Sequence, residues 1–126
     1  MILVFGGVYQ GKLDYVRERF SLQDSDIFFC TDDDATHPAG KKVIYEIDKW
    51  LLALLREGYD VTEQIDKFVK NNQNAIIICN DISCGIVPVE PVMRKWREEV
   101  GWFLVTVAKN SDEVIRLYCG IPTRLK

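Results

Sequence analysis

Residues 1–13 read MILVFGGVYQGKL, and this stretch decides the fold expected for the chain. Residues 2–5 form a short, continuous apolar run that ends at two glycines, as expected of a strand buried on both faces. Beyond the glycines, Leu13, Val16 and Phe20 fall on one face of a predicted helix. The stretch therefore predicts a strand, a glycine-rich loop and a helix, in that order.

The loop between these elements fits the phosphate-binding pattern G-x-x-x-x-G-K-[ST] at every position but the last. Glycines let such a loop curl so that its backbone N–H groups surround phosphate oxygens, and the positive end of the following helix faces the same anion. Lys12 would reach the β- and γ-phosphates of a nucleotide, so it is also a catalytic candidate. The residues expected to bind the nucleotide are Gly6, Gly7, Val8, Tyr9, Gln10, Gly11, Lys12 and Leu13.

Leu13 is the departure from this pattern. A serine or threonine at that position normally ligates Mg²⁺, and a leucine side chain has no atom that can do so. We expect phosphate binding to persist through the backbone and Lys12, with Mg²⁺ as a cofactor whose site is weakened. The alternative is a glycine turn that happens to be followed by a lysine.

The rest of the chain alternates between strand and helix patterns. Apolar runs at 26–30, 42–46, 75–79 and 113–119 predict strands, and amphipathic stripes that begin near residues 47, 60 and 91 predict helices. Such alternation predicts a mostly parallel sheet with helices on both faces. Residues 120–122, Gly-Ile-Pro, predict a turn. We therefore expect one α/β domain over residues 1–126, of the P-loop (RecA-like) class.

Composition narrows the function classes. The net charge is −3 at pH 7, which argues against a dedicated nucleic-acid binder because such a protein shows a basic face. We find no apolar run long enough for a membrane helix and no signal-peptide pattern, so we expect neither a membrane partner nor export. The four cysteines lack metal-ligand spacing, and we expect reduced thiols in a cytoplasmic protein.

A second signature lies at residues 79–88, which read CNDISCGIVP and follow a predicted strand. This segment resembles the Asn-Glu-Val-Gly-x-Gly-Ile-Val-Pro segment of the adenosylcobinamide kinase / adenosylcobinamide-phosphate guanylyltransferase family of cobalamin biosynthesis. Residues 94–101, RKWREEVG, are similar to that family's Arg-x-Phe-Arg-Asp-x-x-Gly, and the first strand and phosphate loop also match. The resemblance covers about the first 30 and the last 50 residues well, and the middle poorly.

The resemblance implies two activities, which are phosphorylation of the corrinoid's aminopropanol hydroxyl and guanylyl transfer from GTP through a covalent histidine. The family's histidine segment is missing here, and the only histidine is His37, in a Thr-His-Pro context. It is either the covalent intermediate or a solvated loop histidine. We expect GTP or ATP as ligand, a corrinoid as candidate substrate, loss of guanylyl transfer, and self-association with a trimer as one candidate. Glu46 resembles the family's acidic residue after the third strand and is expected at the nucleotide site.

Other polar residues leave alternatives open. Asp81 follows a buried strand, where the ligand crevice of a parallel sheet forms, so it is either a catalytic, metal-binding acid or a turn residue. Arg94 and Arg97 share a helix face and either bind substrate or form surface ion pairs. The acidic run 32–34 is either a metal ligand or a solvated loop, and Trp96 is expected in the core.

Two classes of function remain from the sequence. The first is a short corrinoid kinase, a phosphotransferase that uses GTP or ATP. The second is a non-catalytic module that binds a nucleotide or a corrinoid, or serves as a partner subunit. Turnover that requires Mg²⁺ would distinguish the first from the second.

Overall fold

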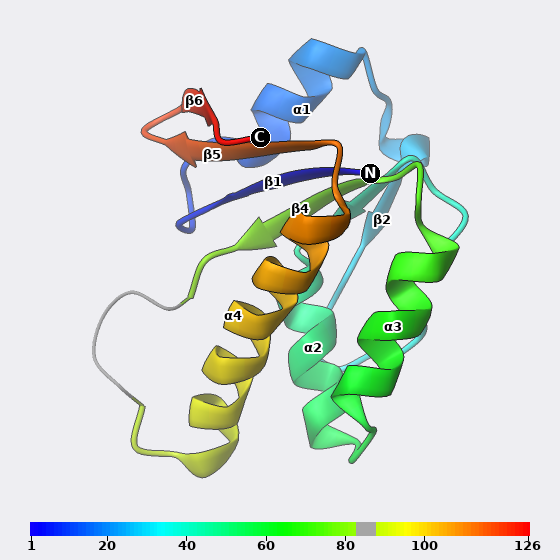
Figure 1. Ribbon diagram of the computed structural model, residues 1–126, viewed down its shortest axis with the longest axis vertical. Helices are drawn as coiled ribbons and strands as arrows, with labels where there is room; N and C mark the ends of the chain where they lie inside the picture. Colours follow the sequence, from blue (N-terminus) through cyan, green and yellow to red (C-terminus); the bar gives the residue numbers. More distant parts are fainter. Residues whose placement is uncertain (83–87) are drawn as a thin grey trace.

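A computed structural model describes residues 1–82 and 88–126 of the chain (Figure 1). Within these residues, six strands form one sheet in the order β2-β3-β4-β1-β5-β6. Neighbouring strands are parallel except for β5 and β6, which pair antiparallel. The strands are β1 (Ile2–Gly6), β2 (Ile27–Phe29), β3 (Val43–Tyr45), β4 (Ile76–Asn80), β5 (Glu113–Tyr118) and β6 (Ile121–Arg124).

Helices cover both faces of this sheet, as the alternating pattern predicted. The helix α1 lies on one face, and α2, α3 and α4 lie together on the other (Figure 1). Their bounds are α1 (Lys12–Phe20), α2 (Ile47–Arg56), α3 (Val61–Asn71) and α4 (Pro91–Asn110), with a short 3-10 helix η1 (Asp24–Asp26) before β2. The predicted α/β fold with a mostly parallel sheet is confirmed.

Side chains of β1 alternate between the two cores. Leu3 packs with the α2–α4 layer and Val4 packs with α1, and both are at most 1% exposed. The larger core contains Trp50, Phe68 and Phe103, one from each of the three helices on that face. A central strand buried on both faces explains the continuous apolar run at the start of the sequence.

Local signals fix the helix ends where the sequence predicted them. The Asp60 carboxylate accepts the Glu63 N–H at 3.2 Å and caps α3. Gly58 has φ 79°, and its N–H and that of Tyr59 donate to Leu55 and Leu54, which closes α2 in a Schellman motif. Pro91 occupies the first turn of α4.

The sequence prediction was wrong about the C-terminal segment. Instead of a turn over residues 120–122, residues 121–124 form β6 and pair with β5 in a hairpin. All four residues of β6 are exposed, so the strand has no apolar alternation that would have indicated it. The tight turn itself is present, at Cys119 and Gly120, both with positive φ.

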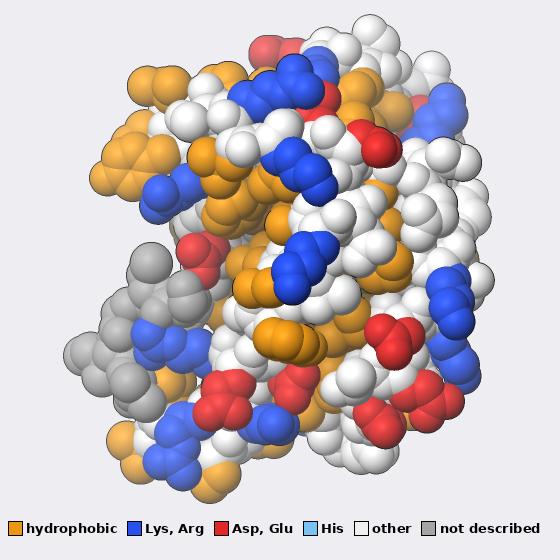
Figure 2. All heavy atoms as spheres, in the orientation of Figure 1, with side chains coloured by type: hydrophobic (Ala, Val, Ile, Leu, Met, Phe, Trp, Pro, Cys, Tyr) orange, Lys and Arg blue, Asp and Glu red, His pale blue; other side chains and the backbone are white. Residues whose placement is uncertain are grey.

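Surface and thiol features complete the description. On the face shown in Figure 2, acidic and basic side chains are interspersed. No helix among the described residues is long and apolar enough to cross a membrane. Cys30, Cys79 and Cys119 are free thiols, and Cys84 lies outside the described residues. Burial raises the pKa of Cys30 to about 12, which makes that thiol a structural one.

Candidate functional site

The loop between β1 and α1 has the backbone shape that its glycines permit. Gly11 has φ 83°, in the left-handed region, and directly precedes the first residue of α1. Gly6 has φ 156°, and a Cβ there would lie 2.3 Å from the Leu117 carbonyl oxygen in β5. The loop therefore needs glycine at both of its ends, for backbone conformation at one and for close packing at the other.

The hairpin of β5 and β6 holds this loop from the side. The Gly120 N–H donates to the Gln10 carbonyl at 3.1 Å, and the Cys119 N–H donates to the Gln10 side-chain oxygen. On the other side, the Asp81 N–H donates to the Gly6 carbonyl at 2.8 Å. Contacts from both neighbouring strands thus fix the loop before any ligand binds.

Lys12 points back into the loop rather than into solvent. Its Nζ donates to the Gly7 carbonyl at 2.5 Å, and the residue is only 5% exposed. Burial lowers the pKa of Lys12, and the opposing effects, led by the nearby Asp48 carboxylate, only partly offset this. A phosphate at this position would give the ammonium group the anionic partner that a desolvated cation needs.

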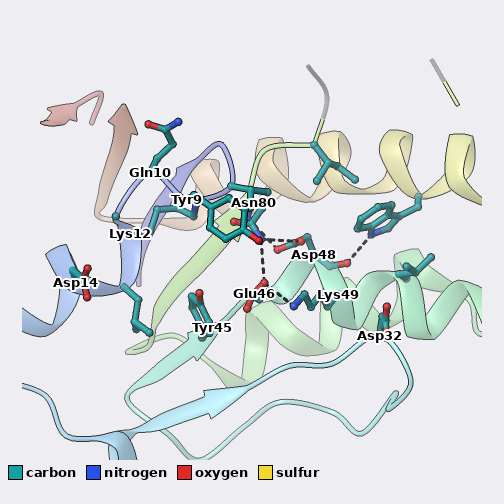
Figure 3. Close-up of a pocket in the computed structure, with 16 residues that line it drawn as sticks. Tyr9, Gln10, Lys12, Asp14, Asp32, Tyr45, Glu46, Asp48, Lys49 and Asn80 are labelled. Atoms are coloured by element: carbon teal, nitrogen blue, oxygen red, sulfur yellow. Dashed lines mark hydrogen bonds and ion pairs between the residues drawn. The ribbon is translucent and has the colours of Figure 1, made fainter. Parts of the chain in front are cut away.

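A cavity of about 710 Å³ lies against the loop (Figure 3). It sits at the carboxyl ends of the central strands, which is where open parallel sheets bind their ligands. Its lining comes from the loop, α1, the segment after β2, the ends of β3 and β4, α2 and α4. The lining residues are Val8, Tyr9, Gln10, Gly11, Lys12, Leu13, Asp14, Asp32, Tyr45, Glu46, Asp48, Lys49, Leu52, Asn80, Ile82 and Trp96.

An acidic wall faces Lys12 across this cavity. Asp48 in α2 is 2% exposed and accepts two hydrogen bonds from Asn80, from its backbone N–H at 3.0 Å and from its side-chain amide at 3.2 Å. The same amide donates to Glu46 at 3.3 Å. Burial raises the pKa of Asp48, although the Asn80 hydrogen bonds act in the opposite direction. Asn80 thus ties the end of β4 to the start of α2.

Lys49 brings a second cation to the cavity. Its Nζ lies 2.9 Å from a Glu46 carboxylate oxygen, and this hydrogen bond is the main reason why the pKa of Lys49 is raised. Glu46 itself has φ 57° at the N-cap of α2, an uncommon conformation for a residue with a Cβ. This backbone geometry and the Asn80 contact place Glu46 at the cavity, and its role at a nucleotide site stays a prediction.

Trp96 corrects one expectation. The sequence placed it in the core, and the ring does pack against the larger core, but it is only partly buried and also lines the cavity. Its indole N–H donates to the Asp48 carbonyl at 2.6 Å, which fixes the ring orientation. Trp50, in contrast, is a core residue at 1% exposure.

Of the remaining predicted site residues, Asp32 of the acidic run lines the cavity and pairs with Arg56 at 3.7 Å, and three others do not line it. Asp81 lies just after β4, and its side chain is not among the described residues that line the cavity. Arg94 and Arg97 lie in the first two turns of α4, also outside that lining. Lys95 between them pairs with Glu99 at 3.0 Å. Residues 83–87 of the second signature lie outside the described residues.

His37 lies away from the cavity. Its ring packs edge-on against Trp50 and Phe68, with centroid distances of 5.5 and 6.3 Å, and it is partly buried rather than fully solvated. Burial is the largest cause of its lowered pKa, followed by the charge of Lys67. The guanylylated-histidine role stays a prediction that this placement does not support.

Sequence reasoning did not single out Asp48 and Lys49. Both fall on the polar face of a clearly amphipathic helix, where charged residues are expected. The sequence pattern therefore does not distinguish them from ordinary surface residues. The usable signal is topological. Because β3 lies beside β4, residues that follow β3 face those that follow β4.

The protein side of a Mg²⁺ site does not fit these residues. The Leu13 side chain offers no oxygen, both Asp48 carboxylate oxygens accept from Asn80, and Glu46 accepts from Lys49 and Asn80. The other carboxylates of the lining are Asp14 and Asp32, and Asp32 pairs with Arg56 at 3.7 Å. Among the described residues, no group of three His, Cys, Asp or Glu side chains could hold a metal ion. Magnesium sites in nucleotide-binding proteins use one or two carboxylates in addition to the phosphates. The charge of Lys49 beside Glu46 opposes that use here.

Comparison with known proteins adds the family. Residues 35–125 match the model of the family described as cobinamide kinase / cobinamide phosphate guanyltransferase. A search of curated proteins found no significant match. The family match covers well over half of the chain and includes every cavity residue from Tyr45 to Trp96, whereas the loop at residues 6–12 lies before it. The chain therefore belongs to the cobinamide kinase / cobinamide phosphate guanyltransferase family, whose P-loop fold it shares.

Proposed function

We propose that this protein binds a nucleoside triphosphate in the cavity, with its phosphates in the loop of residues 6–12. The observation that carries the proposal is Lys12, a lysine only 5% exposed at the first position of α1 and beside a cavity of about 710 Å³. A triphosphate would replace the Gly7 carbonyl as the partner of Nζ. The helix N-terminus would add its partial positive charge.

The reaction class that family membership supports is phosphoryl transfer to a cobinamide hydroxyl. In that reaction, the hydroxyl oxygen forms a bond to the γ-phosphorus, the bond from the γ-phosphorus to the β–γ bridging oxygen breaks, and the nucleoside diphosphate leaves. The hydroxyl proton must pass to a base. We propose Asp81 for that role because its backbone N–H donates to the Gly6 carbonyl beside the loop, although its side chain is not among the described residues that line the cavity. We do not extend the proposal to guanylyl transfer, because His37 packs against Trp50 and Phe68.

A second candidate is a non-catalytic nucleotide-binding module, and Leu13 is the observation that favours it. A leucine at the metal-ligand position permits phosphate binding through backbone N–H groups and Lys12. It removes one of the groups that orient the γ-phosphate for transfer. The two candidates share the binding step and differ in whether product forms.

Calorimetric titration with GTP and with ATP tests the shared step. Hydrogen bonds between charged groups contribute about 1.5–3 kcal/mol, so Lys12→Ala should weaken binding by at least about tenfold. Lys67→Ala, which removes a lysine of α3 outside the cavity, should bind like the unaltered protein. Equal affinities for the Lys12→Ala variant and the unaltered protein would overturn the proposal.

A cobinamide phosphorylation assay then separates the two candidates. Formation of cobinamide phosphate together with a nucleoside diphosphate supports the kinase. Tight nucleotide binding without any product, under conditions in which a family member is active, supports the binding module.

A further inference from the structure

Two lysines reach the proposed nucleotide site from opposite sides. Lys12 comes from α1 beside the loop, and Lys49 comes from the first turn of α2 (Figure 3). Both line the same cavity. A triphosphate carries several negative charges within a few ångströms, and binding it requires that these charges be neutralised. Lys12 alone supplies one positive charge.

Mg²⁺, which usually supplies the rest of the positive charge that neutralises the phosphates, does not fit this site. A Mg²⁺ ion held by the loop needs the hydroxyl that Leu13 lacks, and two carboxylates of the cavity, those of Asp48 and Glu46, already accept hydrogen bonds from Asn80 and Lys49. The Lys49 ammonium group lies on the cavity wall across from the loop, where a positive charge can neutralise the phosphates of a bound nucleotide. The chain thus has leucine at the usual metal-ligand position and carries two ammonium groups, those of Lys12 and Lys49, in the same cavity.

The geometry of Lys49 leaves it able to take a phosphate oxygen. The side chain is 43% exposed, and its ammonium group is paired with Glu46 at 2.9 Å. An ammonium has three N–H donors, and this ion pair occupies one of them. Because Glu46 also accepts from Asn80, the pair is anchored to β4, and the Lys49 nitrogen is held at the cavity wall.

We propose that Lys49 is a second ligand of the nucleotide phosphates and that it takes the place of the metal ion, so that nucleotide binding does not require Mg²⁺. This inference rests on the proposed nucleotide-binding function and adds to it the charge that replaces the cation. A phosphate oxygen bound between Lys12 and Lys49 bridges α1 and α2.

The test measures GTP and ATP affinity calorimetrically in excess EDTA and in excess Mg²⁺, for the unaltered protein, Lys49→Ala and Lys67→Ala. Lys67 is the matched control, because it forms the same kind of intrahelical ion pair, with Glu63 at 3.5 Å, outside the cavity. The unaltered protein and Lys67→Ala should bind about equally in the two buffers. Lys49→Ala should bind about tenfold more weakly in EDTA, and Mg²⁺ should restore part of the loss.

Each other outcome points to a specific failure. A tenfold or larger loss of affinity in EDTA for the unaltered protein would show that the metal is needed and would overturn the inference, while leaving nucleotide binding intact. Equal behaviour of Lys49→Ala and Lys67→Ala would also overturn it. If the unaltered protein binds neither nucleotide in either buffer, the proposed function falls together with the inference.

Discussion

Gly6→Ala is the substitution for which the structure gives the clearest magnitude. The added Cβ would lie 2.3 Å from the Leu117 carbonyl oxygen, about 1 Å short of an ordinary contact. That oxygen belongs to the backbone of a central strand, so relief requires β1 and β5 to move apart or the loop to leave its conformation. The φ of 156° adds a backbone cost for any residue with a side chain.

Overpacking of this kind costs about 1–3 kcal/mol, and the rigid neighbour places Gly6→Ala near the upper end, at about 3 kcal/mol. For a chain of this size, that loss corresponds to a fall in Tm of about 10 °C. Urea denaturation and thermal unfolding, both followed by circular dichroism, measure the two quantities. Nucleotide affinity should fall as well, because Gly6 accepts the Asp81 N–H and begins the loop.

Gly101→Ala is the matched control for this prediction. Gly101 lies within α4, and a Cβ there would meet no atom within 4 Å. Alanine at an open helical position should raise the free energy of unfolding by about 1 kcal/mol. If Gly6→Ala changes that free energy by less than about 0.5 kcal/mol, the packing of the loop against β5 is not as the structure describes it, and the reasoning is refuted.

Two further predictions concern polar groups. Asp48→Ala should lower the free energy of unfolding by about 2–3 kcal/mol, because it leaves two N–H donors of Asn80 at a buried position without their acceptor. Urea denaturation measures this loss, and Asp66→Ala, at an exposed position, is the control. The lowered pKa of His37 means that the unfolded chain binds its proton more readily, so His37 destabilises the fold as pH falls below about 6.5. Replacement by glutamine should therefore make the loss of stability between pH 7 and pH 5 smaller, and an unchanged pH dependence would contradict this.

The regular parts of the fold follow from sequence because each has a strong local signal. Buried parallel strands are continuous apolar runs, and α2 and α3 carry clear apolar stripes with recognisable caps. The hairpin at the C-terminus could not be predicted in this way. Its outer strand contains Pro122 and has no buried residue, so its only cause is pairing with β5.

The candidate site also has one part that the sequence predicts and one part that it does not. The loop of residues 6–12 is a contiguous motif whose spacing is set by the phosphate that it would bind, so sequence alone locates it. The opposite wall, with Asp48, Lys49 and Trp96, is assembled from α2 and α4, and no spacing along the chain connects these residues. The place of Trp96 in the cavity wall was missed for this reason, because a tryptophan on an apolar stripe is compatible with the core and with a cavity wall, and Trp96 contacts both.

The loop lies before the segment that matches the family, yet that segment holds it in place. Gln10 accepts hydrogen bonds from Cys119 and Gly120, and Gly6 accepts one from Asp81. All three donors belong to the residues that match the family model. A connection between a strand and a helix needs no such bracing, and one without it would be mobile in solution. Fixing a loop in advance lowers the conformational entropy that is lost when a ligand binds. If these residues bind the phosphates as we propose, the contacts that hold residues 6–12 against β4 and β5 preform the site, and they connect the proposed function to the part of the chain that matches the family.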